Sequence, residues 1–172
     1  MKKYLVLGGI IILAGVVINY SLGGFKPIEP GLISSNGITL YGWTYEGSHS
    51  SDALDSQIEA LRSIIKDSDQ QGILTVVNYI QPQLEKRGVV KQFIGIEWVE
   101  GNNAVPDNLD SLVIEPYNGI QFVIPIKPLV MPSPEKLKAL ALESAMKMDT
   151  ELSDISIEQY KDKSLVLNFP LK

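Results

Sequence analysis

The fold is decided by GIQFVIPI at residues 119–126, followed by SPEKLKALALESAMKM at 133–148 and DISIEQYKDKSLVLNFPL at 154–171. The first piece places apolar residues at every second position, which predicts a strand. The second opens with a serine N-cap, a proline at the first helical position and a glutamate near the positive end of the helix dipole, which predicts a helix. The third predicts a hairpin of two strands with its turn around Asp162. The order is therefore strand, helix, strand, strand.

Residues 37–99 repeat this order. A strand is predicted at Gly37–Glu46, Ser51 can cap a helix, and two further strands are predicted at 73–81 and 91–99. The predicted helix carries apolar side chains on one face, at Leu54, Ile58, Leu61 and Ile65. The sequence therefore predicts an α+β domain of two βαββ repeats: one antiparallel sheet with two helices on one face and a ligand groove on the other.

The side chains expected on the helix-free face suggest what the groove binds. Successive strand residues point to opposite faces. If Ile38, Leu40 and Gly42 contact the helix, the aromatic residues Tyr41, Trp43 and Tyr45 lie on the helix-free face. In the last hairpin, the second helix would contact the apolar residues Ile155, Ile157, Leu165, Leu167 and Phe169. Aromatic rings around a carboxylate favour a flat or cationic organic ligand. The candidate ligand-binding residues are Tyr41, Trp43, Tyr45, Trp98, Glu158 and Tyr160.

A segment before the repeats predicts membrane attachment. Residues 4–25 carry no charge, and a helix of about 20 apolar residues spans the hydrocarbon layer of a bilayer. A cleaved signal peptide explains the same residues, but the run exceeds the usual apolar region of such peptides, which favours an uncleaved anchor over residues 1–26. Lys2 and Lys3 then place the N-terminus in the cytoplasm and the domain on the exported side. A linker is expected at 27–36, and the domain at 37–172.

Charge and composition exclude several function classes. Residues 1–26 hold three of the 15 basic residues and none of the 20 acidic ones, so the remainder has 12 against 20 and a net charge of −8. That sign argues against a nucleic-acid partner. The absence of cysteine and the single histidine, His49, argue against a metal site, and no pattern indicates a cofactor. The cluster at 48–52 holds Ser, His and Asp, but adjacent residues at a helix start cannot easily form a catalytic triad.

The C-terminal hairpin resembles a known family. Ile157-Glu158-Gln159-Tyr160, then a short turn and a strand ending on Pro170-Leu171, is similar to the ending of GyrI-like small-molecule-binding domains, which also have a βαββ repeat. The resemblance implies a ligand in the groove between the repeats and a role for Glu158 in contacting cationic ligands. The sequence departs from the family pattern at Ser48 and His49 and again at 126–129, where a glycine is missing.

Three functions follow from these observations. The first is a membrane-anchored domain that binds an amphipathic or cationic small molecule, with no covalent chemistry and no catalytic residues. The second is a module that uses its acidic surface and groove to bind a protein partner at the membrane. The third is a hydrolase of small strained or ester-like molecules, similar to some GyrI-like proteins, in which Glu158 polarises a water and Trp43 or Trp98 lies against the substrate.

Overall fold

The computed structural model describes residues 28–68, 71–99, 106–126 and 131–172. The first half contains β1 (Gly31–Ser35), β2 (Ile38–Ser48), α2 (Asp52–Asp67), β3 (Gly72–Tyr79), the short α3 (Pro82–Glu85) and β4 (Val89–Trp98). The second half contains β5 (Asp110–Ile114), β6 (Tyr117–Pro125), α4 (Pro134–Lys147), β7 (Ile155–Lys161) and β8 (Ser164–Pro170). The predicted α+β class and the two βαββ repeats are confirmed, and each repeat is preceded by one short extra strand.

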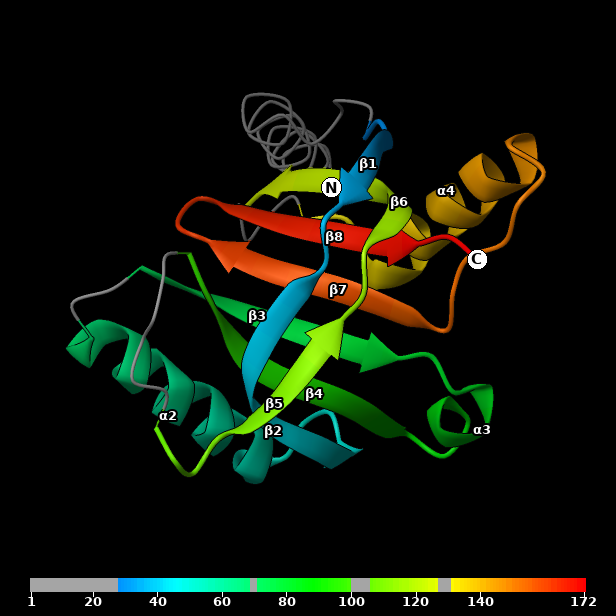
Figure 1. The fold of residues 1–172 in the computed structure, drawn as a ribbon. Helices are drawn as coiled ribbons and strands as arrows, with labels where there is room; N and C mark the ends of the chain where they lie inside the picture. Colours follow the sequence, from blue (N-terminus) through cyan, green and yellow to red (C-terminus); the bar gives the residue numbers. More distant parts are fainter. Residues whose placement is uncertain (1–27, 69–70, 100–105, 127–130) are drawn as a thin grey trace, which may run out of the picture.

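All eight strands form one antiparallel sheet, in the order β1-β6-β8-β7-β3-β4-β2-β5. The two halves meet at the centre, where β3 pairs with β7. At the two ends, β1 pairs with β6 and β2 with β5 in one shared register, so that residues 31–42 and 110–121 form a long ladder. In Figure 1 this ladder crosses in front of the central strands. The sheet is therefore strongly curled.

Two glycines permit this path. Gly37, between β1 and β2, has φ of 85°, a conformation that side chains with a Cβ rarely adopt. Gly42 lies opposite Gly95 in the β2–β4 pair, and a Cβ on Gly42 would stand 1.9 Å from the backbone oxygen of Ile94. Larger residues at these two positions would force the strands apart.

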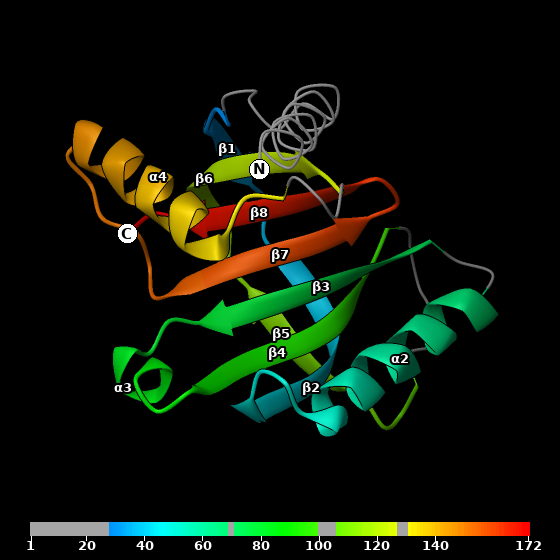
Figure 2. The same cartoon turned by 180° about the vertical axis from the view of Figure 1, so that it is seen from behind.

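The two long helices cover the same face of the sheet, one over each half, as Figure 2 shows. Ser51 and Ser133 cap α2 and α4 as the sequence predicts, accepting hydrogen bonds from Ala53 N and Lys136 N. Beneath α2, Leu54 and Leu61 are buried against the first half of the sheet. Beneath α4, buried residues of the helix pack on those of the second half: Leu137, Ala141 and Ala145 against Ile120, Phe122, Ile124, Leu165, Leu167 and Phe169.

The opposite face has its own core and is not an open groove. Leu40, Val77, Phe93 and Ile157 are buried there, and they pack against side chains of the crossing ladder, namely Ile38, Leu112, Ile114 and Tyr117. The prediction that the helix-free face carries the groove is wrong, because the curl of the sheet brings β1, β2, β5 and β6 across that face and fills it.

The N-terminal predictions have mixed outcomes. Residues 31–35 of the expected linker form strand β1 and pair with β6, so the prediction of a linker is wrong for these five residues. The predicted anchor at 4–25 lies outside the described residues. No helix in the described part of the chain is long and apolar enough to cross a membrane.

Candidate functional site

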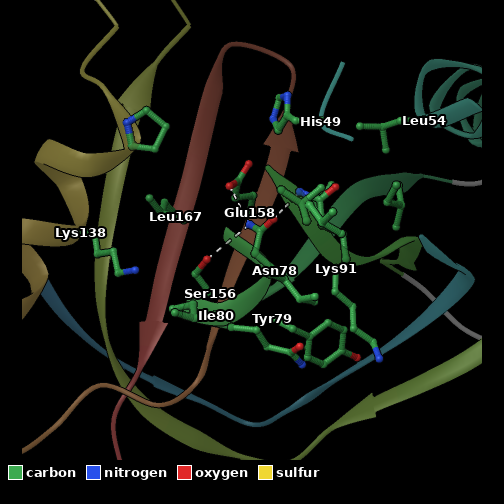
Figure 3. A pocket seen from close by; sticks show the side chains of 18 of the residues that line it. His49, Leu54, Asn78, Tyr79, Ile80, Lys91, Lys138, Ser156, Glu158 and Leu167 are labelled. Atoms are coloured by element: carbon green, nitrogen blue, oxygen red, sulfur yellow. Dashed lines mark hydrogen bonds between the residues drawn. The ribbon is translucent and has the colours of Figure 1, made fainter. Parts of the chain in front are cut away.

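A pocket of about 560 Å³ lies on the helix-covered face, between α2 and α4. Strands β3, β4, β7 and β8 form its floor, residues at the start of α2 and α4 form two walls, and the segment around α3 closes one end. Figure 3 shows the pocket, with Leu54 of α2 and Lys138 of α4 on opposite sides of it. Apolar residues form a large part of the lining, among them Leu54, Ile58, Val76, Leu84, Val90, Ile94, Leu167 and Phe169.

Glu158 occupies the centre of this floor. The strand register aligns six side chains in one row across the sheet: Trp43, Ile94, Val76, Glu158, Leu167 and Phe122. Glu158 is the one polar member of the row, and its side chain is half-buried. Because water competes less at such a position than on the open surface, the carboxylate interacts more strongly with a nearby charge.

Two neutral donors hold the Glu158 carboxylate. Asn78 Nδ2 donates to Oε1 at 2.8 Å, and the Tyr160 hydroxyl donates to Oε2 at 2.8 Å. Asn78 is itself held from two sides, since its Nδ2 also donates to Ser156 Oγ at 3.3 Å and its Oδ1 accepts from Gln92 Nε2 at 2.6 Å. The carboxylate is thus fixed by side chains from three adjacent strands.

The charged residues of the described ranges that line the pocket with Glu158 include Lys91 and Lys138. Glu158 forms no ion pair with any residue of the described ranges. Lys91, which also lines the pocket, lies 3.6 Å from the carboxylate of Glu46. Burial, and then the adjacent Glu158 carboxylate, raise the pKa of the Tyr160 phenol well above its usual range. Tyr160 therefore stays protonated, and so remains a hydrogen-bond donor, at neutral pH.

Of the six residues predicted to bind ligand, two line the pocket: Glu158 and Tyr160. Tyr45 is buried and its hydroxyl donates to Ser48 O at 2.7 Å, while Trp43 and Trp98 pack at the edge of the core under α2. The Trp43 Nε1 donates to Asn108 O at 2.9 Å. Tyr41 is half-buried and does not line the pocket.

The face assignments of β2 and the last hairpin need correction. Trp43, Tyr45 and Tyr41 lie on the helix-covered face, whereas Leu40 belongs to the opposite core. In the hairpin, Glu158 pairs directly with Leu167 and Tyr160 with Leu165, so these polar and apolar residues share one face. The sequence pattern showed that side chains alternate between the two faces of the sheet, but not which of the two faces the helices cover. The pocket therefore lacks the tryptophan that the hydrolase hypothesis placed against the substrate.

Two polar residues of the site were missed from the sequence: Asn78 and Gln92. Asn78 interrupts the apolar run ILTVVNYI at 73–80, and a polar residue inside a buried strand is the signal that could have identified it. Among the described residues, no group of three or more His, Cys, Asp or Glu side chains could hold a metal ion.

Comparison with known proteins supports the fold. No family model matches the chain and no curated protein matches its sequence. The crystal structure of the EcmrR C-terminal domain aligns with a TM-score of 0.60 and 12% identity, over 84% of this chain and 98% of the other. The fold is GyrI-like.

Two further solved structures share this GyrI-like fold. SAV2435 bound to tetraphenylphosphonium aligns with a TM-score of 0.51 and 13% identity, over 84% of this chain and 94% of the other. A hydrolase from Listeria innocua aligns with a TM-score of 0.58 and 10% identity, over 90% and 98%. At these identities the likeness establishes the architecture alone.

Proposed function

We propose that the pocket between α2 and α4 binds an amphipathic organic cation, with Glu158 facing the positive charge and the apolar lining covering the rest of the ligand. The observation that carries the proposal is the position of Glu158: a half-buried carboxylate in an apolar row, held by two neutral donors and without a cationic partner among the described residues. A carboxylate shielded in this way from part of the solvent attracts a bound cation more strongly than one on the open surface does.

The shape and lining of the pocket favour a bulky ligand. A volume of about 560 Å³ lies within the usual range of small-molecule sites. Apolar side chains flank Glu158 on both sides, with Ile94 and Val76 towards α2 and Leu167 towards α4. A cation whose charge is surrounded by apolar groups suits this arrangement better than a small hydrated ammonium ion. The GyrI-like neighbour SAV2435, bound to tetraphenylphosphonium, supports the same ligand class.

Membrane attachment is the second part of the proposal. It rests on the uncharged residues 4–25 and on the lysines before them, and it places the binding domain on the exported side of the membrane. Labelling an engineered cysteine at Asn102 with an impermeant reagent on intact cells tests the orientation. Labelling is expected, and its absence would show that the domain lies on the other side.

Isothermal titration of the full chain with tetraphenylphosphonium at pH 7 tests the binding proposal. The wild-type protein is expected to bind it, and Glu158→Gln, which keeps the shape of the side chain but removes its charge, is expected to lose at least about tenfold in affinity. Glu97→Gln is the matched control, because Glu97 is a half-buried carboxylate on the opposite face that accepts a hydrogen bond from Gln159.

Two outcomes would contradict the proposal. One is equal affinity in the wild-type protein and Glu158→Gln. The other is a loss in Glu97→Gln as large as that in Glu158→Gln, because the effect would then reflect overall charge. Turnover of a bound compound that disappears with Glu158→Gln would instead favour the hydrolase.

A further inference from the structure

Three side chains on neighbouring strands form a hydrogen-bonded chain that ends on the candidate ligand-binding carboxylate. Gln92 of β4 donates to Asn78 of β3, and Asn78 donates to Glu158 of β7. We propose that Asn78 and Gln92 are positioning residues that hold the Glu158 carboxylate in its ligand-facing orientation before any ligand arrives. This inference rests on the proposed function, because it explains how the site stays ready for a cation.

The direction of hydrogen-bond donation, from Gln92 through Asn78 to Glu158, follows from the chemistry of the carboxylate. An ionised carboxylate can only accept hydrogen bonds, so the Asn78 side chain must present its NH₂ group to Glu158. The Asn78 Oδ1 then faces Gln92, which must present its own NH₂ group in turn. If the Asn78 amide turned over, its Oδ1 would face the Glu158 carboxylate and its NH₂ group would face the NH₂ group of Gln92, so both hydrogen bonds would be lost.

The chain has an electrostatic consequence. Hydrogen bonds to the charged form of a carboxyl group favour that form. A donor that a further side chain already holds in place needs less free energy to reorient than a donor that must first turn towards the charge. Removing Gln92 should therefore affect Glu158 even though no hydrogen bond joins the two residues.

Other ionisable groups around the pocket do not replace this effect. Tyr160 on β7 donates to the other carboxylate oxygen, and its raised pKa keeps it neutral. The remaining ionisable residues that line the pocket come from the β2–α2 connection, α2, β3, β4 and α4: His49, Asp55, Tyr79, Lys91, Glu135 and Lys138. All of them stay unchanged in the substitutions proposed below, so their contributions are common to every variant.

The test compares cation binding among variants of the full chain at pH 7. Tetraphenylphosphonium is titrated into each variant by calorimetry. Asn78→Leu is expected to weaken binding by about tenfold and Gln92→Leu by about threefold, which is the range expected for the loss of one hydrogen bond. Gln121→Leu is the matched control, because it removes a comparable hydrogen bond of 3.0 Å, to Asn168, away from the pocket, and its affinity should stay unchanged.

A second readout needs no ligand. The NMR signal of the Glu158 side-chain carboxyl carbon is compared at pH 7 in the wild-type protein and in Gln92→Leu. A chemical shift that is unchanged in Gln92→Leu overturns the inference, even where affinity falls. A wild-type protein that binds no tetraphenylphosphonium, with a carboxyl signal that still moves in Gln92→Leu, would overturn the proposed function and leave Asn78 and Gln92 as positioning residues.

Discussion

The two halves of the molecule share one architecture but differ in the residues at their interface. Val76 and Glu158 each lie 25 residues after the serine that caps the preceding helix, Ser51 or Ser133, and they pair directly with each other at the centre of the sheet. One half thus contributes a valine and the other a carboxylate at equivalent positions. The site is a local departure from the repeat, made where the halves meet.

The residues around Val76 and Glu158 are arranged to hold a single carboxylate. Asn78 and Tyr160 are also at equivalent positions, each 27 residues after its capping serine, and both donate to the single carboxylate. A second carboxylate in place of Val76 would lie directly opposite the first and repel it. The two halves therefore share the elements that maintain the fold and differ at the position of Val76 and Glu158, where the candidate site lies.

The largest expected effect is on the stability of the second half. Phe122 is fully buried and packs edge to face against Phe169, with ring centroids 6.1 Å apart. Phe122→Ala should lower the free energy of unfolding by about 3–5 kcal/mol, because it leaves a cavity between the sheet and α4. Its equivalent in the row, Trp43, is only partly buried, so Trp43→Ala should cost less. Urea unfolding of the two variants measures the difference, and equal losses would contradict it.

Exchanging the central pair sharpens the comparison. Glu158→Val alone should lose at least about tenfold in affinity for tetraphenylphosphonium, since the pocket then has no central carboxylate. Adding Val76→Glu should recover part of that affinity, because Asn78 and Tyr160 are placed to donate to either position. Titration calorimetry of both variants decides between the outcomes. No recovery in a double variant that still folds would show that the halves are not equivalent at this point.

Alkaline pH tests one tyrosine on each face of the sheet. The pKa of Tyr160 on the pocket face and that of Tyr117 on the opposite face are both raised, chiefly by burial. Since each folded-state pKa exceeds the unfolded value of about 10, their contribution to stability is complete below pH 10 and is lost as the pH rises further. Tyr160→Phe and Tyr117→Phe should each flatten that loss in urea unfolding from pH 9 to 11. Unchanged slopes in both variants would contradict the assigned environments.

The smallest expected effect concerns the helix caps. Ser51 and Ser133 accept hydrogen bonds of 3.2 and 3.4 Å from Ala53 N and Lys136 N. Ser51→Ala and Ser133→Ala should each lower the free energy of unfolding by about 1 kcal/mol, because one helix N–H loses its partner. Thermal unfolding of each variant measures this, and Ser56→Ala in the exposed interior of α2 serves as the control. A larger loss in that control would argue against the caps as the cause.

The element order was predictable from the sequence, and the location of the site was only partly so. Period-two alternation, the serine caps and the closing hairpin define the two repeats because these signals are local along the chain. Glu158 and Tyr160 were predicted from side-chain alternation in the last hairpin, although they share their face with Leu165 and Leu167, and the resemblance of 157–160 to GyrI-like endings supported Glu158. The two halves of the crossing ladder lie about 80 residues apart in sequence, so no local signal shows that they cover one face of the sheet.

The choice of face accounts for most of the error in the predicted site. The sequence pattern places Trp43 and Tyr45 on the helix-free face, because it assigns Leu40 and Gly42 to the face that contacts the helix. The curled sheet instead uses Leu40 in the opposite core, where it packs with Phe93. Asn78 and Gln92 were missed for a related reason: their role depends on the register between β3, β4 and β7, which side-chain alternation within one strand does not determine.

A crystal structure of the protein with tetraphenylphosphonium measures most directly where a ligand binds. The account predicts the phosphorus atom beside the Glu158 carboxylate, with phenyl rings against Ile94 on one side and Leu167 on the other, between α2 and α4. A ligand bound on the opposite face of the sheet, over Phe93 and the crossing ladder, would contradict it.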